Sequence, residues 1–226
     1  MLLRQFSTSH YCRKARLALG YKQINYRCEN LTPGLHILKV KPLTGLTTLP
    51  VLLPQMEGQP EAIADSTEII KFLEAYQPEP KLFLSNHEQQ THAWMLEDWL
   101  DESIGTATRF VYYQFRAGEG KEIDPSLLSQ VVIGVVRKQY NINNATVKLA
   151  TNRLANALVE LSISWQKSQY LVGDRLSVAD ITAAALLSPL ALIPHYHQEY
   201  PWLFERIVEI HQICGEELPP GLESRI

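Results

Sequence analysis

The sequence predicts a chain of two parts, an α/β unit at the N-terminus followed by an all-helical unit. Strand-like and helix-like stretches alternate over the first 76 residues. Beyond residue 87, strand-like runs disappear and long helical periods take over. The stretch between them contains two prolines. We therefore expect domains at residues 1–76 and 87–226, joined by a linker at residues 77–86.

The first 40 residues have the pattern of strand, helix, strand and helix. Residues 2–6 form a short strand, and a helix follows over residues 11–19 with Gly20 as its C-cap. Residues 24–29 form the second strand. Residues 33–40 form a short helix that begins with a proline, which is favoured in a first turn. A β-α-β unit of this kind favours a parallel strand pair.

A β-hairpin and a third helix complete the first unit. Residues 49–53 are a short buried strand, residues 54–60 are turn formers, and residues 61–64 are the returning strand. A helix then runs from Asp65 to Ala75. The resulting order is β-α-β-α-β-β-α. This is the thioredoxin-like order, in which helices cover both faces of a mixed sheet.

The second unit reads as a helical bundle. We expect helices at residues 87–116, 124–140, 145–167, 177–187 and 201–214, and a tail at residues 216–226. Ser177 and Asp180 form a capping box for the fourth of these helices. On the first helix, four acidic residues are expected to form a solvated face: Glu97, Asp98, Asp101 and Glu102.

Composition excludes several functions. The formal net charge is −3 and no run of Lys or Arg marks a nucleic-acid patch. The longest mainly apolar stretch, residues 181–193, is too short to span a membrane. No signal peptide is seen, and three widely spaced cysteines fit a reducing cytoplasm. His195 and His197 have no third ligand nearby, so we expect no metal.

A polar turn, residues 7–12, precedes the first helix. Free backbone N–H groups and the positive end of the helix dipole gather there, and such a place stabilises an anion. A thiolate is an anion, so we expect this turn to activate a thiol that belongs to a bound peptide. The alternative interpretation of Ser9 is a helix N-cap.

Two further segments allow both a structural and a ligand-binding interpretation. A cis bond before Pro50 would expose the backbone of Leu49 to an added peptide strand, whereas a trans bond would be merely structural. Asp65 and Glu68 fit a capping box. The Ser66 hydroxyl and the first helical N–H groups also suit a ligand carboxylate, with Asp65 meeting an ammonium group. Both interpretations can hold at once.

Four motifs in one order resemble the soluble glutathione S-transferases over essentially the whole chain. They are SHYCRKARLAL at residues 9–19, LPVL at 49–52, DS at 65–66 and the G-x-x-x-S-x-A-D box at 173–180. The turn at Ser9 is similar to that of bacterial members, particularly the cyanobacterial, chi-like class. This resemblance implies an enzyme that conjugates glutathione with small electrophiles such as isothiocyanates or activated aryl halides. It also implies a homodimer, with no cofactor beyond glutathione as cosubstrate.

The resemblance assigns roles to particular residues. Ser9 would donate a hydrogen bond to the glutathione sulfur, with Tyr11 and His10 as alternatives. Leu49 would pair with the cysteinyl backbone, Pro50 would be cis, and Asp65 with Ser66 would hold the γ-glutamyl end. The loop after Lys41 is longer than the family pattern, so the residue for the glycyl carboxylate stays open among three candidates: His36, Lys39 and Thr48.

The electrophile is expected between the first unit and the long helix that begins at residue 87. The candidates near the end of that helix are Arg109, Tyr112, Tyr113 and Arg116. Because adjacent residues point in different directions, Tyr112 and Tyr113 cannot both face the core. Two rival functions remain: a glutathione-dependent isomerase or thiol reductase, and a non-catalytic binding or scaffold protein.

Overall fold

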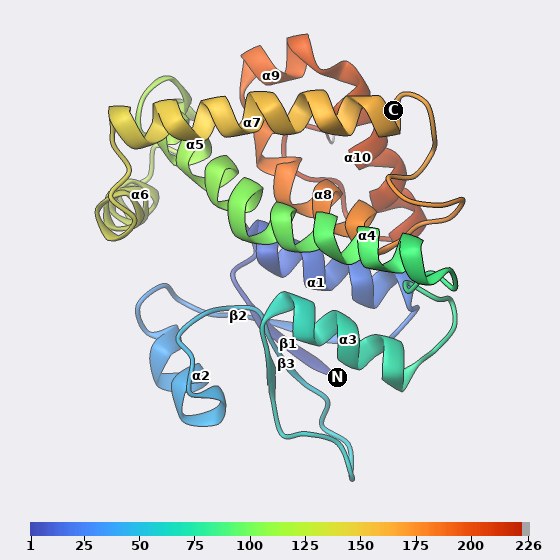
Figure 1. Cartoon of the computed structure of the whole chain (residues 1–226). Coiled ribbons are helices and arrows are strands. Elements are labelled where there is room, and N and C mark those ends of the chain that lie inside the picture. The colour runs from blue at the N-terminus through green and yellow to red at the C-terminus, as the bar shows by residue number, and fades with distance from the viewer. Residues whose placement is uncertain (223–226) are drawn as a thin grey trace.

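The computed structural model describes residues 1–222, so the expected tail at 216–226 lies partly outside the described residues. Figure 1 shows a small sheet with its helices on one side of the molecule and the C-terminal helices on the other. Helix α1 (His10–Tyr21) lies between these two layers. It packs against both α3 (Ser66–Tyr76) and α8 (Val178–Leu187) and so joins the sheet to the helical layer.

The sheet is mixed and has four strands. They are β1 (Leu2–Gln5), β2 (Arg27–Asn30), β3 (Val51–Leu53) and β4 (Ile63–Ala64). Their spatial order is β2-β1-β3-β4, with β1 and β2 parallel and the other two pairs antiparallel. Helices α2 (His36–Thr44) and α3 (Ser66–Tyr76) complete the unit. The expected β-α-β-α-β-β-α order and the parallel first pair are therefore confirmed.

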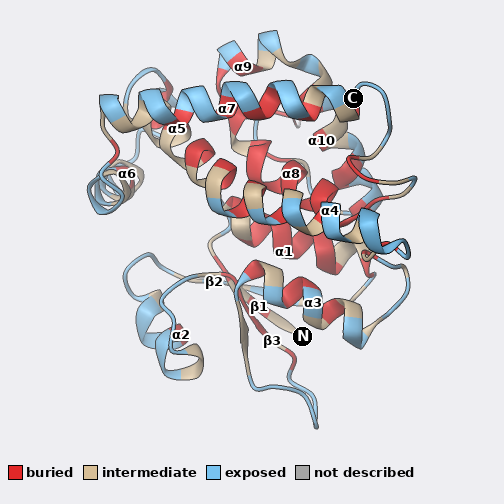
Figure 2. Ribbon diagram, viewed as in Figure 1, coloured by how far each residue is buried: buried red, intermediate tan, exposed pale blue. Residues whose placement is uncertain are grey.

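The second layer is helical throughout. Its α-helices are α4 (His87–Asp98), α5 (Gly105–Ala117), α6 (Leu127–Gln139), α7 (Asn144–Trp165), α8 (Val178–Leu187), α9 (Pro194–Glu199) and α10 (Pro201–Cys214). Every residue of α8 is buried, as Figure 2 shows, and the capping box of Ser177 and Asp180 begins it as expected. None of the helices within residues 1–222 combines the length and apolar character needed to cross a bilayer.

The expected long helix at residues 87–116 is helical throughout but changes type in its middle. A π-helical segment, Trp99–Ile104, separates α4 from α5. Single π-helical turns of this kind widen the helix locally and redirect backbone carbonyls, and they occur often at functional sites. Here the segment is bonded to the N-terminal part of α1, because the Tyr11 hydroxyl donates to the backbone carbonyl oxygen of Asp101. Residues 188–200, where no helix is expected from the sequence, include the short helix α9 around His195.

The expected solvated acidic face is wrong for two of its four members. Glu97 is 3% exposed and Asp101 is 7% exposed, whereas Asp98 and Glu102 are exposed. The reason is Lys14 of α1, which is fully buried and forms ion pairs with both carboxylates. Its ammonium group also donates to the hydroxyl of Thr67 at 2.9 Å. A buried charge requires such partners, and the acidic residues turn inward to supply them.

Gly20 does not end α1 as expected. The helix continues to Tyr21, and Lys22 is its C-cap. A Cβ atom at Gly20 would lie 2.1 Å from the backbone carbonyl oxygen of Cys214, at the end of α10. The glycine is therefore needed for close packing of α1 against α10.

Candidate active site

Three chain segments meet at one end of the sheet. Val51, the first residue of β3, pairs with Arg4 near the end of β1 and with Ala64 at the end of β4. Because β3 is antiparallel to both neighbours, its beginning lies beside their ends. Three segments join the sheet at this end: residues 6–9 follow β1, residues 45–50 precede β3, and Asp65–Ser66 follow β4. The register thus gathers the three motifs singled out in the sequence.

The size of this corner suits a short peptide. Adjacent strands lie about 4.8 Å apart, so β1 and β4 are separated by about 10 Å. An extended tripeptide is also about 10 Å long. The peptide bond between Leu49 and Pro50 is cis, as one interpretation of the motif required. Among residues 1–222, the backbone N–H and C=O of Leu49 have no hydrogen-bond partner, so both are available to an added strand.

Ser9 is the N-cap of α1. Its Oγ accepts a hydrogen bond of 3.4 Å from the backbone N–H of Cys12, which satisfies one free donor of the helix end. The Ser9 hydroxyl proton is committed to no carbonyl or carboxylate of the described residues. Burial raises the pKa of the Cys12 thiol to about 11, and hydrogen bonding by Ser9 opposes this only in part. Cys12 is therefore a protonated, packed side chain.

The two alternative donors are engaged elsewhere. The Nε2 atom of His10 lies 3.2 Å from the backbone carbonyl oxygen of Gly105. Burial, with a contribution from Arg109, lowers the pKa of His10 to about 3, so the ring is neutral and donates this bond. The Tyr11 hydroxyl donates to the carbonyl oxygen of Asp101 at 2.8 Å, and burial raises the pKa of Tyr11 to about 12. Of the three candidates for donating to a thiolate, Ser9 is the one whose proton is not donated to a backbone carbonyl oxygen.

The N-terminus of α3 forms the far side of the corner. The carboxylate of Asp65 accepts hydrogen bonds from the backbone N–H groups of Thr67 at 2.8 Å and Glu68 at 3.2 Å. Glu68 itself accepts from Lys71 at 2.7 Å and does not close the capping box. The φ angle of Asp65 is +76°, in the left-handed region that a residue other than glycine rarely adopts. Ser66, the next residue and the first of α3, is buried.

The three candidates for the glycyl carboxylate differ in their partners. The Nε2 atom of His36 lies 3.0 Å from the backbone carbonyl oxygen of Thr47, and the His36 ring packs against Phe6. Lys39 is paired with Glu29. The hydroxyl of Thr48 is exposed and has no hydrogen-bond partner within residues 1–222.

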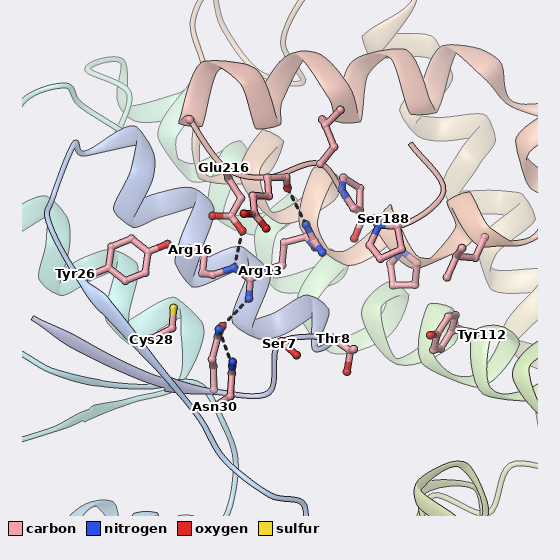
Figure 3. Close-up of a pocket in the computed structure, with 18 residues that line it drawn as sticks. Ser7, Thr8, Arg13, Arg16, Tyr26, Cys28, Asn30, Tyr112, Ser188 and Glu216 are labelled. Atoms are coloured by element: carbon pink, nitrogen blue, oxygen red, sulfur yellow. Dashed lines mark hydrogen bonds and ion pairs between the residues drawn. The ribbon is translucent and has the colours of Figure 1, made fainter. Parts of the chain in front are cut away.

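A cleft of about 550 Å³ opens on the other side of the polar turn (Figure 3). Ser7 and Thr8 lie on one wall, Tyr112 on another, and Glu216 on the wall opposite Ser7. Its neighbours in the C-terminal segment, residues 215–220, also line the cleft. The sequence did not predict this cleft, because part of its lining, residues 215–220, comes from the distant C-terminal segment. Ser9, Leu49 and Asp65 are not among its lining residues. The cleft is lined by Cys28 and Asn30 of β2, on one side of β1, whereas the corner lies beside β3 and β4 on the other side.

Two arginines of α1 bind the C-terminal segment that lines the cleft. The Nε atom of Arg16 forms an ion pair of 2.5 Å with Glu216, and its Nη1 donates to Gln5 at 2.6 Å. Arg13 donates to the backbone carbonyl oxygen of Glu217 at 3.2 Å. The structure buries both arginines under the C-terminal segment.

The four electrophile-site candidates do not converge on one point. Tyr112 lines the cleft, so one of the two adjacent tyrosines does face a cleft. Tyr113 packs edge-on against it, with ring centres 5.3 Å apart. Arg116 donates to the Tyr112 hydroxyl at 3.0 Å and to the Ser129 hydroxyl at 3.3 Å. Arg109 lies away from the cleft lining and stacks on Tyr11.

No metal centre is apparent in the part of the chain that the structure describes. Residues 1–222 contain no group of three or more His, Cys, Asp or Glu side chains placed to hold a metal ion. His195 instead pairs with Glu199, four residues along α9.

The N-terminal part of the chain matches a known family model. Residues 3–81 match the family model described as glutathione S-transferase, N-terminal domain. Among curated proteins, none matches the sequence significantly. Similar solved structures include a glutathione S-transferase from Rhodospirillum rubrum F11. It is 20% identical with a TM-score of 0.72, and the match covers 98% of this chain and 89% of that one.

Two further solved structures are similar in fold. A glutathione S-transferase from Methylobacterium radiotolerans JCM 2831, in complex with glutathione sulfonate, is 20% identical with a TM-score of 0.72. That match covers 96% of this chain and 94% of the other. The beta-etherase LigF from Sphingobium sp. strain SYK-6 is 17% identical with a TM-score of 0.72, covering 98% and 96%. The described part of the chain therefore has the fold of these proteins.

Proposed function

We propose that this chain, whose residues 3–81 form a glutathione S-transferase N-terminal domain, is a glutathione transferase. The observation that carries the proposal is the strand register. It brings the Ser9 turn, the unpaired backbone of Leu49 and the N-terminus of α3 to one end of the sheet. These supply a donor for a thiolate, a strand partner for a peptide and anion-binding N–H groups for a terminal carboxylate.

In the proposed mechanism Ser9 stabilises the glutathione thiolate. A free thiol has a pKa of about 8.5, and lowering it by about two units requires about 2.7 kcal/mol. A hydrogen bond to a charged acceptor, together with the positive end of α1, is sufficient in size. The thiolate then attacks an isothiocyanate carbon or displaces halide from an activated aryl ring. Catalysis consists of positioning and thiolate stabilisation.

The cleft beside the turn is the proposed place for the electrophile. Ser7 and Thr8, which precede Ser9 in the chain, line this cleft, and Tyr112 offers an aromatic surface for stacking. The remaining expectations belong to this proposal: a homodimer, a cytoplasmic location, chi-like membership and domains at residues 1–76 and 87–226. A thiol reductase would need a reactive cysteine at the turn, and the buried, protonated thiol of Cys12 speaks against it.

The test is to titrate the thiol of bound glutathione and to measure conjugation. Wild type, Ser9→Ala, His10→Ala and Tyr11→Phe are compared, with unfolding curves to show that each variant is folded. We expect Ser9→Ala alone to return the thiol pKa toward its free value and to lower kcat at least tenfold. If Ser9→Ala changes neither quantity, Ser9 is not the activating residue. If wild type neither binds glutathione nor conjugates it, the chain is a transferase-like binding protein.

A further inference from the structure

Helix α6 exposes an apolar stripe on its outer face. The helix lies at the edge of the molecule and packs mainly against α5, with Ile133 buried on its inner side (Figures 1 and 2). On the opposite side, four large apolar side chains are 57–85% exposed: Leu127, Leu128, Val131 and Val135. Single exposed apolar side chains are ordinary, but a contiguous stripe of them marks an interaction surface.

The spacing of the stripe is that of a helix-pairing seam. Leu128, Val131 and Val135 are three and four residues apart, and Lys138 follows three residues later. This is the spacing through which two helices pack side by side in a coiled coil. Gly134, next to the seam, has no atom within 4 Å of its Cβ position, so it leaves room for a large side chain of a partner helix.

The two ends of the stripe carry opposite charges. Asp124 is held at the start of the helix, because its carboxylate accepts a hydrogen bond of 3.1 Å from the backbone N–H of Ser126. The last turn of α6 contains the basic residues Arg137 and Lys138. Asp124 and Lys138 are both exposed, and neither forms an ion pair within residues 1–222. Both charges are therefore free to pair with another molecule.

An antiparallel copy of the same helix matches this stripe. If a two-fold axis passes beside Val131, Leu128 of each copy meets Gly134 of the other, and Leu127 meets Val135. A large side chain thus faces a glycine, and the contact is the same in both directions, as in an isologous dimer. A contact between two helices of 13 residues is smaller than a standard interface, which buries about 1,200–2,000 Å². Pairing should therefore be weak and depend on protein concentration.

The charges select the antiparallel orientation. In the antiparallel pair Asp124 of each copy meets Lys138 of the other, and the dipoles of the two helices are opposed. A parallel pair would place each charge beside its like. The acidic end also disfavours a membrane as the partner, because the cytoplasmic leaflet is negatively charged.

We propose that the exposed stripe of α6 binds the same stripe of a second copy of this chain, in an antiparallel helix pair. The inference goes beyond the proposed transferase function, since this contact requires no glutathione. It also assigns a specific surface, whereas the homodimer expected from the family resemblance has none assigned. If the chain associates through another face as well, pairing through α6 doubles the mass of that species.

The first test measures mass by sedimentation from micromolar to millimolar concentrations of wild type, Val131→Glu and Val159→Glu. Val159 on α7 is the matched control, because both valines are 62% exposed. We expect the mass of wild type to double as the concentration rises. Val131→Glu places two carboxylates together at the two-fold axis, so the dissociation constant of this step should rise at least tenfold. The control should keep the wild-type value, and equal behaviour of all three proteins would overturn the inference.

A charge exchange tests the orientation. We expect Lys138→Glu to raise the dissociation constant several-fold, because it places a carboxylate beside Asp124 of the other copy. Adding Asp124→Lys to this variant restores opposite charges and should return the constant toward the wild-type value. Unfolding curves show whether each variant is folded. A folded double variant that associates no better than Lys138→Glu would refute the antiparallel pair.

Cross-linking tests the same contact without a buried charge. Val131→Cys and the control Val159→Cys are prepared with Cys28→Ser, because Cys28 is the exposed native cysteine and Cys12 and Cys214 are buried. A short bis-maleimide should join two copies of Val131→Cys and leave the control monomeric on a denaturing gel. Equal cross-linking of both variants would refute the contact. Wild type that keeps one mass at all concentrations but binds vesicles of phosphatidylcholine and phosphatidylglycerol would instead make the stripe a lipid-binding face.

Discussion

The hydroxyl of Tyr11 donates a hydrogen bond of 2.8 Å to the backbone carbonyl oxygen of Asp101. This bond ties the start of α1 to the π-helical segment between α4 and α5. A carbonyl in an ordinary helix interior is engaged by the residue four positions on, so the π-helical turn helps Asp101 to accept a second donor. The phenol proton is thereby held in the helical layer, away from the thiol site.

Tyr11→Phe removes this bond and tests its purpose. We expect the free energy of unfolding to fall by about 1–2 kcal/mol, because a carbonyl loses its donor in a largely buried place. The pKa of the glutathione thiol in the complex should stay at its wild-type value. Urea unfolding and thiol titration measure the two effects. A thiol pKa that returns to the value of free glutathione would instead make Tyr11 the activating residue.

The buried ammonium of Lys14 joins α1, α3 and the segment around Asp101. We expect Lys14→Met to lower the free energy of unfolding by about 3–5 kcal/mol, because two buried carboxylates lose their counter-charge. The matched control is Lys71→Met, whose exposed pair with Glu68 should be worth less than about 1 kcal/mol. Chemical unfolding of both variants measures the difference. Equal effects would show that the burial of Lys14 is unimportant.

Gly105 allows α5 to approach α1 closely. A Cβ atom there would lie 2.8 Å from the Tyr11 hydroxyl and 3.0 Å from a methyl group of Leu186. Gly105→Ala should therefore cost about 1–3 kcal/mol of stability through overpacking. Gly134→Ala is the control, because no atom lies within 4 Å of its Cβ position. Removing that glycine from the interior of α6 should stabilise the protein by about 0.5–1 kcal/mol. Thermal unfolding distinguishes the opposite signs.

Local signals predicted much of this structure, and long-range packing accounts for the rest. The order of strands and helices along the chain, the α8 capping box and the cap at Asp65 depend on residues close together in the sequence. Periodicity and cap chemistry therefore predicted them. The burial of Glu97 depends on Lys14, 83 residues away in the chain. The cleft depends on residues 215–220 returning over α1. No local pattern contains such information.

The pH dependence of stability should reveal two neutral buried histidines. Burial lowers the pKa of His211 to about 4 and that of His10 to about 3, from 6.5 in the unfolded chain. His211 donates from Nδ1 to the carbonyl oxygen of Ile207 at 2.7 Å. Since the unfolded state binds these protons first, their contribution to stability is complete above pH 6.5. It is lost as the pH falls toward 4, by up to about 1.4 kcal/mol per pH unit for each group.

Urea unfolding between pH 7 and pH 4 measures that slope. We expect His211→Gln to reduce it and the exposed control His87→Gln to leave it unchanged. A wild-type stability that does not decrease below pH 6 would contradict the assignment of both rings as neutral.

Asp65 combines a structural task with a proposed ligand contact, and two substitutions separate them. Asparagine keeps the capping oxygen and tolerates the φ angle of +76°, so Asp65→Asn should change the free energy of unfolding by less than about 0.5 kcal/mol. Asp65→Ala removes the cap and should cost about 1 kcal/mol. If the carboxylate meets the glutathione ammonium group, both variants raise the KM for glutathione several-fold. A KM that rises only in Asp65→Ala would mean that Asp65 supports the helix end and that another residue holds the ammonium group.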